Sequence, residues 1–162
     1  MKNNYYLTID SPIGLLRLVS DHDTLVSVSF IELKEEDSDI QPDILKGAAN
    51  QLREYFSGER KIFNLNINPA GTDFQKKVWE KVKQVEFGQT VSYLEIAKQT
   101  GSEKNTRAVG LANGKNPIPI IIPCHRIIGS NRKLTGYAGG IERKRFLLQH
   151  ELQFSEKNDL LF

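Results

Sequence analysis

The sequence of 162 residues contains a single cysteine, Cys124. A lone cysteine cannot close an internal disulfide bond, and it cannot supply a multi-cysteine metal site. No apolar run reaches the roughly 18–20 residues that cross a membrane. The N-terminal stretch MKNNYYLTIDSP also lacks the apolar core of a secretory signal. We therefore expect a cytoplasmic protein that has no membrane span and binds no metal.

The net charge of +2 hides an uneven distribution. Residues 1–68 carry 7 basic and 11 acidic side chains, a balance of −4, whereas residues 69–162 carry 15 and 9, a balance of +6. Opposite signs in the two halves are typical of a protein in which one domain meets a polyanion. Chance variation of surface charge gives the same pattern, so charge alone leaves both interpretations open.

The first part of the chain predicts a small sheet with one helix. Strand-forming runs occupy residues 4–9, 13–20 and 24–33, and turn residues separate them. Apolar residues at helical spacing predict a helix over 43–56, and 61–68 reads as one more strand. The step Asn68-Pro69-Ala70-Gly71 suggests a boundary between domains 1–68 and 69–162.

The second part changes to helical patterns. Helices are predicted over 74–86, 92–100, 104–113 and 142–152, the first two beginning after capping residues. The expected fold class is therefore α+β, a sheet-plus-helix domain followed by a mostly helical domain of winged helix-turn-helix type.

Residues 92–113 have the pattern of a helix-turn-helix. In the second helix, Ala108, Val109 and Ala112 are expected to pack inward. The residues expected to point outward are Thr106, Arg107, Asn113 and Lys115. Most packed helix pairs do not touch DNA, but the basic balance of this half favours a DNA-binding interpretation.

Cys124 lies in the apolar run IPIIIPCHRIIG. A lone cysteine is more often a buried, inert side chain than a nucleophile. However, His125 can act as a base that generates thiolate, and Arg126 adds positive charge that lowers a thiol pKa. Glu151 is the candidate carboxylate that orients the histidine, although it could equally be a solvated charge. His22 and His150 are expected at the surface.

These residues belong to motifs that resemble the O6-alkylguanine-DNA alkyltransferases. The motifs TVSYLEIA, TRAVGLANGKNPIPIIIPCHRII, LTGYAGG and LLQHE occur in the order and spacing of that family over roughly residues 70–152. Residues 1–68 resemble the family only in their general pattern of a sheet with one helix. Relatives that hold zinc have N-terminal cysteine and histidine ligands that this chain lacks.

The resemblance implies roles for individual residues in the reaction. Cys124 accepts the alkyl group, His125 activates it through a water, and Glu151 supports the histidine. Asn116 holds the active-site turn together. Tyr93 crowds the phosphate that rotates during base flipping and donates a proton to the leaving guanine.

The resemblance also implies contacts with DNA and with the extruded base. Arg107 replaces the flipped base in the stack, on a helix whose other DNA-contacting residues are Thr106, Ala108, Ala112 and Asn113. Tyr137 flanks the extruded guanine. The carbonyls of Cys124 and Ile127 face its exocyclic amine, and the N–H of Ala138 approaches O6. Some relatives have serine in place of Ala138, so one hydroxyl contact is missing here.

The implied function is DNA repair by transfer of an alkyl group from O6-alkylguanine, and from O4-alkylthymine, to Cys124. Each molecule reacts once, as a monomer and without a cofactor; cooperative binding along DNA is left open. A thiolate held by His125 would react with a half-maximum below pH about 8.5. Two alternatives are a non-catalytic protein that binds alkylated bases and a Cys-His hydrolase.

Overall fold

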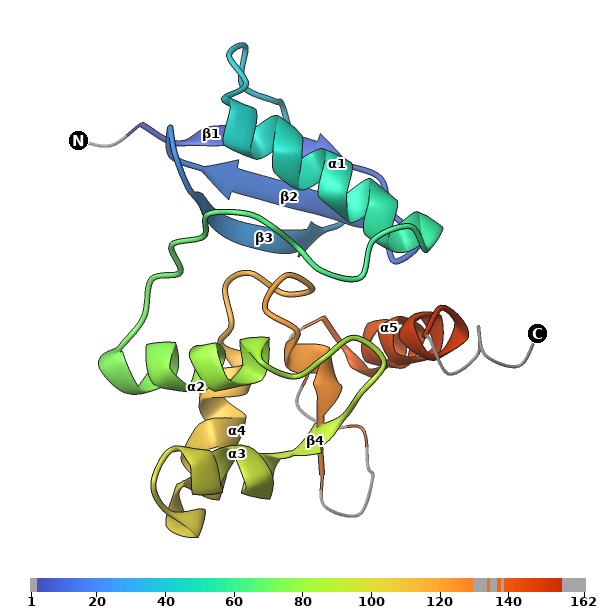
Figure 1. Cartoon of the computed structure of the whole chain (residues 1–162). Helices are drawn as coiled ribbons and strands as arrows, with labels where there is room; N and C mark the ends of the chain where they lie inside the picture. Colours follow the sequence, from blue (N-terminus) through green and yellow to red (C-terminus); the bar gives the residue numbers. More distant parts are fainter. Residues whose placement is uncertain (1–2, 130–133, 135–136, 138, 156–162) are drawn as a thin grey trace. The chain divides into compact units, whose positions relative to one another are not determined.

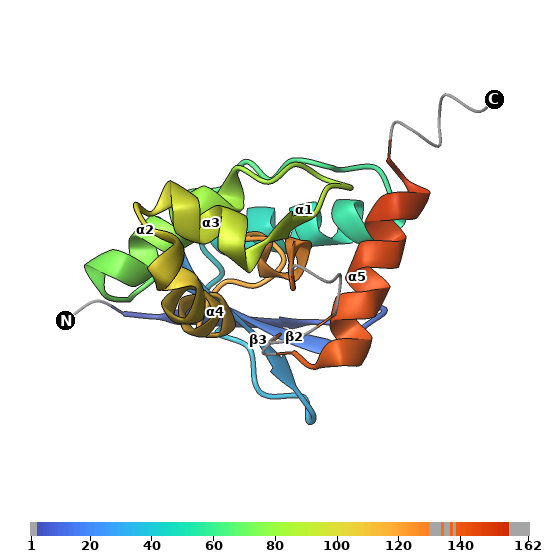
Figure 2. The same cartoon turned by 90° about the horizontal axis from the view of Figure 1, so that it is seen from below.

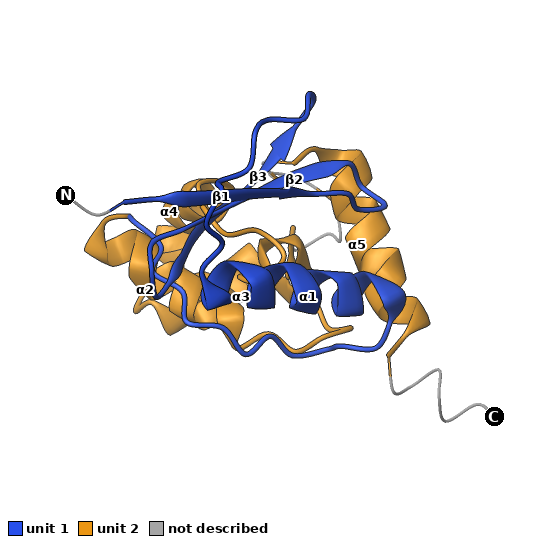
Figure 3. Cartoon of the chain, turned by 90° about the horizontal axis from the view of Figure 1, so that it is seen from above, with its two compact units in different colours: residues 1–70 blue, residues 71–162 orange. Residues whose placement is uncertain are grey.

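The computed structural model of the chain describes residues 3–129, 134, 137 and 139–155. The chain divides into two compact units, residues 1–70 and residues 71–162 (Figure 3). Among the described residues, three strands and one helix form the first unit, and four α-helices, two 3-10 turns and a two-stranded pairing form the second. The α+β fold class that the sequence predicts is confirmed.

Unit 1 is an antiparallel sheet covered on one face by a helix. The strands β1 (Tyr5–Ile9), β2 (Leu15–Ser20) and β3 (Leu25–Ile31) pair in the order β1-β2-β3. Helix α1 (Asp43–Ser57) lies across this sheet (Figure 1). Alternate β2 side chains, including Leu16 and Leu18, are fully buried, as expected for a sheet with one covered face. The buried face of α1 consists of Leu45, Ala48, Ala49, Leu52 and Tyr55.

The predicted strand over residues 61–68 is wrong. The segment makes only one isolated bridge, in which Ile67 pairs with Leu25. The Gln51 side chain of α1 occupies backbone groups of this segment that a neighbouring strand would otherwise bind. Its amide nitrogen donates to the Asn64 carbonyl (3.0 Å), and its oxygen accepts the Asn64 N–H (2.8 Å). Ile62 in this segment is 79% exposed.

Unit 2 contains α2 (Asp73–Lys83), α3 (Tyr93–Gln99), α4 (Thr106–Gly114) and α5 (Ile141–Gln153). A 3-10 turn, η1 (Glu103–Asn105), leads into α4. A second turn, η2 (Cys124–Arg126), leads into β5 (Ile127–Ile128), which pairs in parallel with β4 (Val91–Ser92). Helices α2, α3 and α4 form one group, and α5 lies apart from them next to η2 (Figures 1 and 2).

The helix group is held by apolar packing and one buried hydrogen bond. Val78 and Val82 of α2, Ile96 of α3 and Val109 of α4 are fully buried. Trp79 lies among them, and its Nε1 donates to the carbonyl of Ala112 at 2.9 Å. A buried indole N–H needs a partner, so this bond fixes the position of α4 against α2.

The structure corrects three predicted orientations. Ala108 is exposed, although it was expected to pack inward, and Asn113 is buried, although it was expected to point outward. His150 is also buried rather than superficial, because the rings of Phe87, Phe146 and Phe154 surround it. None of the described helices is long and apolar enough to cross a membrane.

The start of α2 provides a test of the local structure. The Thr72 hydroxyl accepts the N–H of Gln75 (3.1 Å), and the Gln75 side chain accepts the N–H of Thr72 (2.9 Å). Replacing a capping threonine with alanine costs about 1 kcal/mol. We therefore expect Thr72→Ala to lower the free energy of unfolding by about that amount, measured by urea denaturation. Thr72→Ser keeps the hydroxyl and should be neutral; an equal loss in both variants would contradict the role of the cap.

Candidate active site

The candidate nucleophile lies in a buried segment of unit 2. All residues from 118 to 127 are buried, and the Cys124 side chain is 2% exposed. Within this segment Ile120 has a φ of 76°. A β-branched residue in the left-handed region is strained and persists only where its surroundings enforce it. The Ile118 carbonyl, which accepts the N–H of Ile122 (2.9 Å), helps to close this turn.

Two asparagine side chains tie the Cys124 segment to the end of α4. Asn116 donates to the Ile122 carbonyl (2.8 Å) and accepts the N–H of Ile118 (2.9 Å), as expected of a residue that holds the turn together. Asn113 donates to the carbonyl of Cys124 itself (3.1 Å). The burial of Asn113, which the sequence did not reveal, thus places an amide directly against the backbone of the candidate nucleophile.

Glu151 of α5 binds both residues that follow Cys124. One carboxylate oxygen lies 2.6 Å from His125 Nε2, and Arg126 donates to both oxygens, from Nε at 2.8 Å and from Nη2 at 3.0 Å. The N–H of Gly88 adds a further bond at 3.2 Å. Burial would raise the pKa of Glu151, but His125 and Arg126 hold it well below its usual range. The carboxylate is therefore ionised, and the interpretation of Glu151 as a solvated charge is wrong.

This arrangement determines which ring nitrogen of His125 can act as a base. The Glu151 carboxylate can only accept a hydrogen bond, so the ring proton of His125 must lie on Nε2 and be donated to it. Nδ1 is buried and has no hydrogen-bond partner among the described residues. Burial lowers the pKa of His125, and it outweighs the opposing effect of Glu151. The imidazole is therefore neutral, with a free lone pair on Nδ1.

The Cys124 thiol is protonated in the chain without DNA. Burial raises its pKa to about 11, although Asn116 and the charge of Lys144 act in the opposite direction. The expectation that Arg126 lowers this pKa is wrong, since its guanidinium is bound to Glu151 and to the Val85 carbonyl (2.6 Å). The dry surroundings outweigh nearby positive charge.

Lys144 is a member of the site that the sequence analysis missed. It is fully buried, and its Nζ donates to the Ile127 carbonyl at 2.6 Å. The same Nζ lies 5.8 Å from the centre of the Tyr93 ring. Burial lowers the pKa of Lys144 to about 8. Lys144 precedes Glu151 by seven residues and so shares its face of α5, a spacing that could have indicated a common environment.

The tyrosines and the expected carbonyl acceptors lie around this centre. Tyr93 begins α3, where the Ser92 hydroxyl caps the helix by accepting the N–H of Glu95 (3.0 Å). Tyr137 is buried, and burial together with the nearby Cys124 raises its pKa well above 10. The carbonyls of Cys124 and Ile127 already accept bonds from Asn113 and Lys144. Ala138 lies outside the described residues.

The residues expected to contact DNA divide between two faces of α4. Arg107 and Ala108 are exposed, and Thr106 is half-buried with its hydroxyl bound to the Glu103 carbonyl (2.6 Å). Ala112 and Asn113 are buried on the opposite face. The surface that α4 offers to a ligand is therefore built on Arg107 and Ala108, without Ala112 or Asn113.

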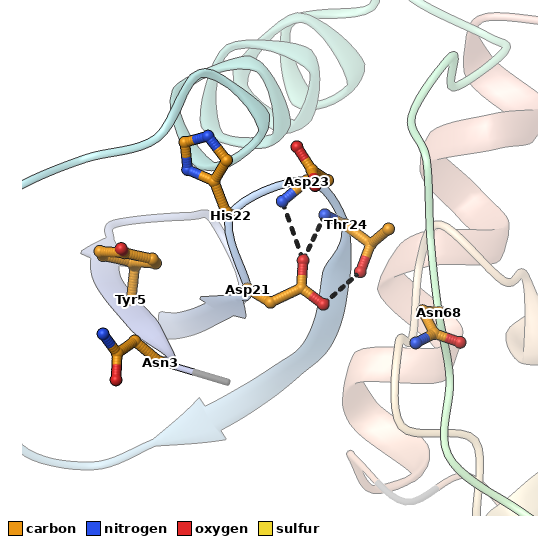
Figure 4. Close-up of a pocket in the computed structure, with 7 residues that line it drawn as sticks. All are labelled: Asn3, Tyr5, Asp21, His22, Asp23, Thr24 and Asn68. Atoms are coloured by element: carbon orange, nitrogen blue, oxygen red, sulfur yellow. Dashed lines mark hydrogen bonds between the residues drawn. The ribbon is translucent and has the colours of Figure 1, made fainter. Parts of the chain in front are cut away.

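Unit 1 contains a pocket without comparable chemistry. It lies at the turn between β2 and β3 and is lined by Asn3, Tyr5, Asp21, His22, Asp23, Thr24 and Asn68 (Figure 4). The Asp21 carboxylate accepts the N–H groups of Asp23 (2.9 Å) and Thr24 (2.7 Å) and the Thr24 hydroxyl (2.9 Å). These bonds stabilise the turn itself. Among the described residues, no three His, Cys, Asp or Glu side chains are grouped as a metal site requires.

Comparison with sequence families covers nearly the whole chain. Residues 4–69 match the model described as "6-O-methylguanine DNA methyltransferase, ribonuclease-like domain". Residues 73–153 match "6-O-methylguanine DNA methyltransferase, DNA binding domain". The second match contains Cys124, His125, Glu151 and all of α4.

Individual relatives agree with these matches. A methylated-DNA–protein-cysteine methyltransferase of Methanosarcina acetivorans is 47% identical over 152 residues, covering 91% of this chain and 97% of the relative. The crystal structure of the Mycobacterium tuberculosis O6-methylguanine methyltransferase superposes with a TM-score of 0.85 at 46% identity, covering 94% and 95% of the two chains. The same organism's OGT in complex with DNA gives 0.83 at 47% identity, covering 93% and 94%.

Removing the Glu151 carboxylate should measurably lower the free energy of unfolding. Glu151→Gln leaves His125 and Arg126 without their carboxylate, and breaking one partner of a buried pair costs about 3 kcal/mol. Because the folded-state pKa of Glu151 is depressed, this stabilisation is present above the unfolded-state pKa and is lost as pH falls through the folded-state value. We expect the gap between variant and wild type to be constant above pH about 5 and to shrink in acid.

Urea denaturation at a series of pH values measures this gap. Glu142→Gln is the matched control, because Glu142 lies on the same helix and its ion pair with Arg145 is exposed. Exposed pairs contribute about 0–1 kcal/mol. A Glu151→Gln variant as stable as this control would show that the buried network contributes little.

Proposed function

The chain belongs to the 6-O-methylguanine DNA methyltransferase family, and on that premise we propose that Cys124 accepts the alkyl group of O6-alkylguanine in duplex DNA, once per molecule. The observation that supports this most strongly is the buried Cys124-His125-Glu151 arrangement. It combines a soft nucleophile, a neutral base with a free nitrogen, and a carboxylate that stabilises the base once protonated.

The reaction is a displacement at carbon. The Cys124 sulfur attacks the alkyl carbon, and the bond between that carbon and guanine O6 breaks. The thiol proton passes to Nδ1 of His125, directly or through a water, and Glu151 stabilises the resulting imidazolium. Tyr93 gives a proton to the departing guanine and regains one from the His125 imidazolium through solvent, so the net transfer moves one hydrogen from sulfur to guanine. A thioether remains, and no described residue offers a route to its cleavage.

The resting state is suited to a protein that reacts only once. A thiol held neutral by burial is protected from stray electrophiles, because thiolate is the reactive form. Lys144 and Asn116 supply the positive charge and the hydrogen bond that favour thiolate once the proton moves to His125. The apolar segment 118–123 keeps water away from the reacting carbon. Reactivity therefore develops when the lesion is in place.

The alkylated base reaches this site by flipping out of the duplex, since a base inside the stack cannot contact a buried thiol. Arg107 is exposed at the start of α4, where it can fill the gap left by the extruded base, and Tyr137 is buried near Cys124, where it can flank that base.

The protein acts as a monomer without a cofactor, and O4-alkylthymine is a second substrate. Residues 1–68 form a supporting domain, and the domain that carries out the transfer begins at residue 69. A purely lesion-binding function is not favoured.

Mass spectrometry tests the transfer itself. After incubation with a duplex that contains one O6-methylguanine, we expect the peptide with Cys124 to gain one CH2 unit and one lesion to be lost per protein molecule. Cys124→Ala should bind the same duplex and gain no mass. Tight binding by the wild type with no mass change would instead support the lesion-binding alternative.

The rate of transfer should depend little on pH near neutrality. The pKa of His125 lies below its ordinary 6.5, and that of Cys124 is raised from 9.0 to about 11, so neither group titrates between pH 6.5 and 9.0. If the proton moves within this pair during the reaction, the single-turnover rate changes little around neutrality and falls in acid as His125 becomes protonated. It also declines above pH about 8, where Lys144 loses the charge that favours thiolate. A rate that rises tenfold per pH unit would instead require thiolate formed beforehand.

A further inference from the structure

Asn113, near the end of α4, carries a buried hydrogen-bond acceptor beside the nucleophile. The residue is 1% exposed, and its amide nitrogen donates to the Cys124 carbonyl at 3.1 Å. Its side-chain oxygen Oδ1 is buried and has no hydrogen-bond partner among the described residues. Buried oxygens of native proteins are almost always paired, because an unpaired one destabilises the fold. The position of this oxygen therefore calls for a functional explanation.

The orientation of the Asn113 amide follows from its partner. A carbonyl oxygen can only accept a hydrogen bond, so the amide must turn its nitrogen toward the Cys124 carbonyl. Oδ1 is then the atom of this side chain that remains available to a ligand. Because the alkyl carbon of a substrate must touch the Cys124 sulfur, the reacting base has to approach the backbone segment to which this amide is bound.

The Cys124 carbonyl itself has no acceptor capacity left. A carbonyl oxygen has two lone pairs. The Asn113 amide takes one of them, and the N–H of Ile127, which closes the turn η2, takes the other. The family resemblance assigns this carbonyl to the exocyclic amine of guanine, but in this chain both of its lone pairs are occupied. An acceptor without a partner is present instead on Asn113.

We propose that Asn113 Oδ1 accepts a hydrogen bond from the exocyclic amine of the extruded guanine, in place of the Cys124 carbonyl. The proposal rests on the alkyl transfer proposed above. It makes Asn113 a specificity-determining residue, which meets the base inside the site rather than the groove outside. O4-alkylthymine presents a carbonyl oxygen where guanine has its amine, so the same acceptor makes it the slower substrate.

The amine can be removed from the substrate without changing the reacting atoms. O6-methylhypoxanthine has the same ring system and the same O6-methyl group as O6-methylguanine, but no exocyclic amine. Loss of one hydrogen bond to a buried acceptor corresponds to about a tenfold loss in rate. The wild type should therefore transfer the methyl group from a duplex with O6-methylguanine about tenfold faster than from the same duplex with O6-methylhypoxanthine.

Asn113→Leu removes the acceptor and nearly conserves the volume of the side chain. The lone pair that this change frees on the Cys124 carbonyl faces residue 113, where the leucine blocks it. We expect the preference for the guanine substrate to fall from about tenfold to about unity. Asn113→Ala, a second variant in case the first folds poorly, should give the same ratio. Intrinsic differences between the substrates cancel, because each ratio is compared with that of the wild type.

Trp79→Phe is the matched control. It removes the indole hydrogen bond to the Ala112 carbonyl (2.9 Å), so it loosens the same end of α4 without touching the backbone of Cys124. It should slow both substrates alike and keep the wild-type ratio. Rates are measured as single turnovers, and the amount of protein that reacts gives the folded fraction. A loss of folded protein therefore does not enter the ratio.

Three outcomes would overturn the proposal while leaving the alkyl transfer intact. Equal rates of the wild type on the two substrates would mean that the site does not bind the amine. An unchanged ratio in the Asn113 variants would place the amine on another acceptor and leave Oδ1 to an ordered water. An equal shift of the ratio in Trp79→Phe would attribute the effect to the packing of α4. Failure of the wild type to react with either duplex would instead overturn the proposed function.

Discussion

The buried carboxylate of Glu151 is the group on which the rest of the site depends. It connects His125 and Arg126, the two residues after the nucleophile, to the end of α5, while Arg126 and Gly88 connect it to the segment that follows α2. Three parts of unit 2 that are distant in sequence thus meet at one ionised group. A charge buried to this degree is tolerated only when every oxygen is paired, and the four bonds to Glu151 meet that requirement.

Around this group the structure balances reactivity against protection. The same apolar packing that excludes water from Cys124 raises its pKa and keeps it a thiol. Asn116 and Asn113 hold the backbone of the nucleophile in place, and the strained φ of Ile120 shows that this turn is imposed by its surroundings. In the proposed reaction, Nδ1 of His125 is the base, and thiolate forms only as the alkyl group is transferred.

Much of the fold could be predicted from local patterns, because helical spacing, caps and turn residues act over a few residues. The helices from α1 to α5 and the first three strands follow from such signals, as does the grouping of Cys124 with His125. The strand expected over 61–68 does not form because the Gln51 side chain of α1 binds the Asn64 N–H and carbonyl that a neighbouring strand would otherwise pair with. Lys144 and Asn113 were missed or misplaced for a related reason: burial of a polar side chain depends on a distant partner, here the carbonyl of Ile127 or Cys124, which no local pattern specifies.

The most direct test of this account is the protonation state of His125 in the resting protein. Nitrogen NMR of a sample labelled in its histidine rings, with His125 assigned by comparison with His125→Gln, reports each ring nitrogen separately. The account predicts a neutral ring at pH 7.5, with the proton on Nε2 beside Glu151 and Nδ1 unprotonated. A ring with protons on both nitrogens would mean that His125 and Cys124 already exist as an ion pair, and the picture of a neutral thiol activated only during transfer would be wrong.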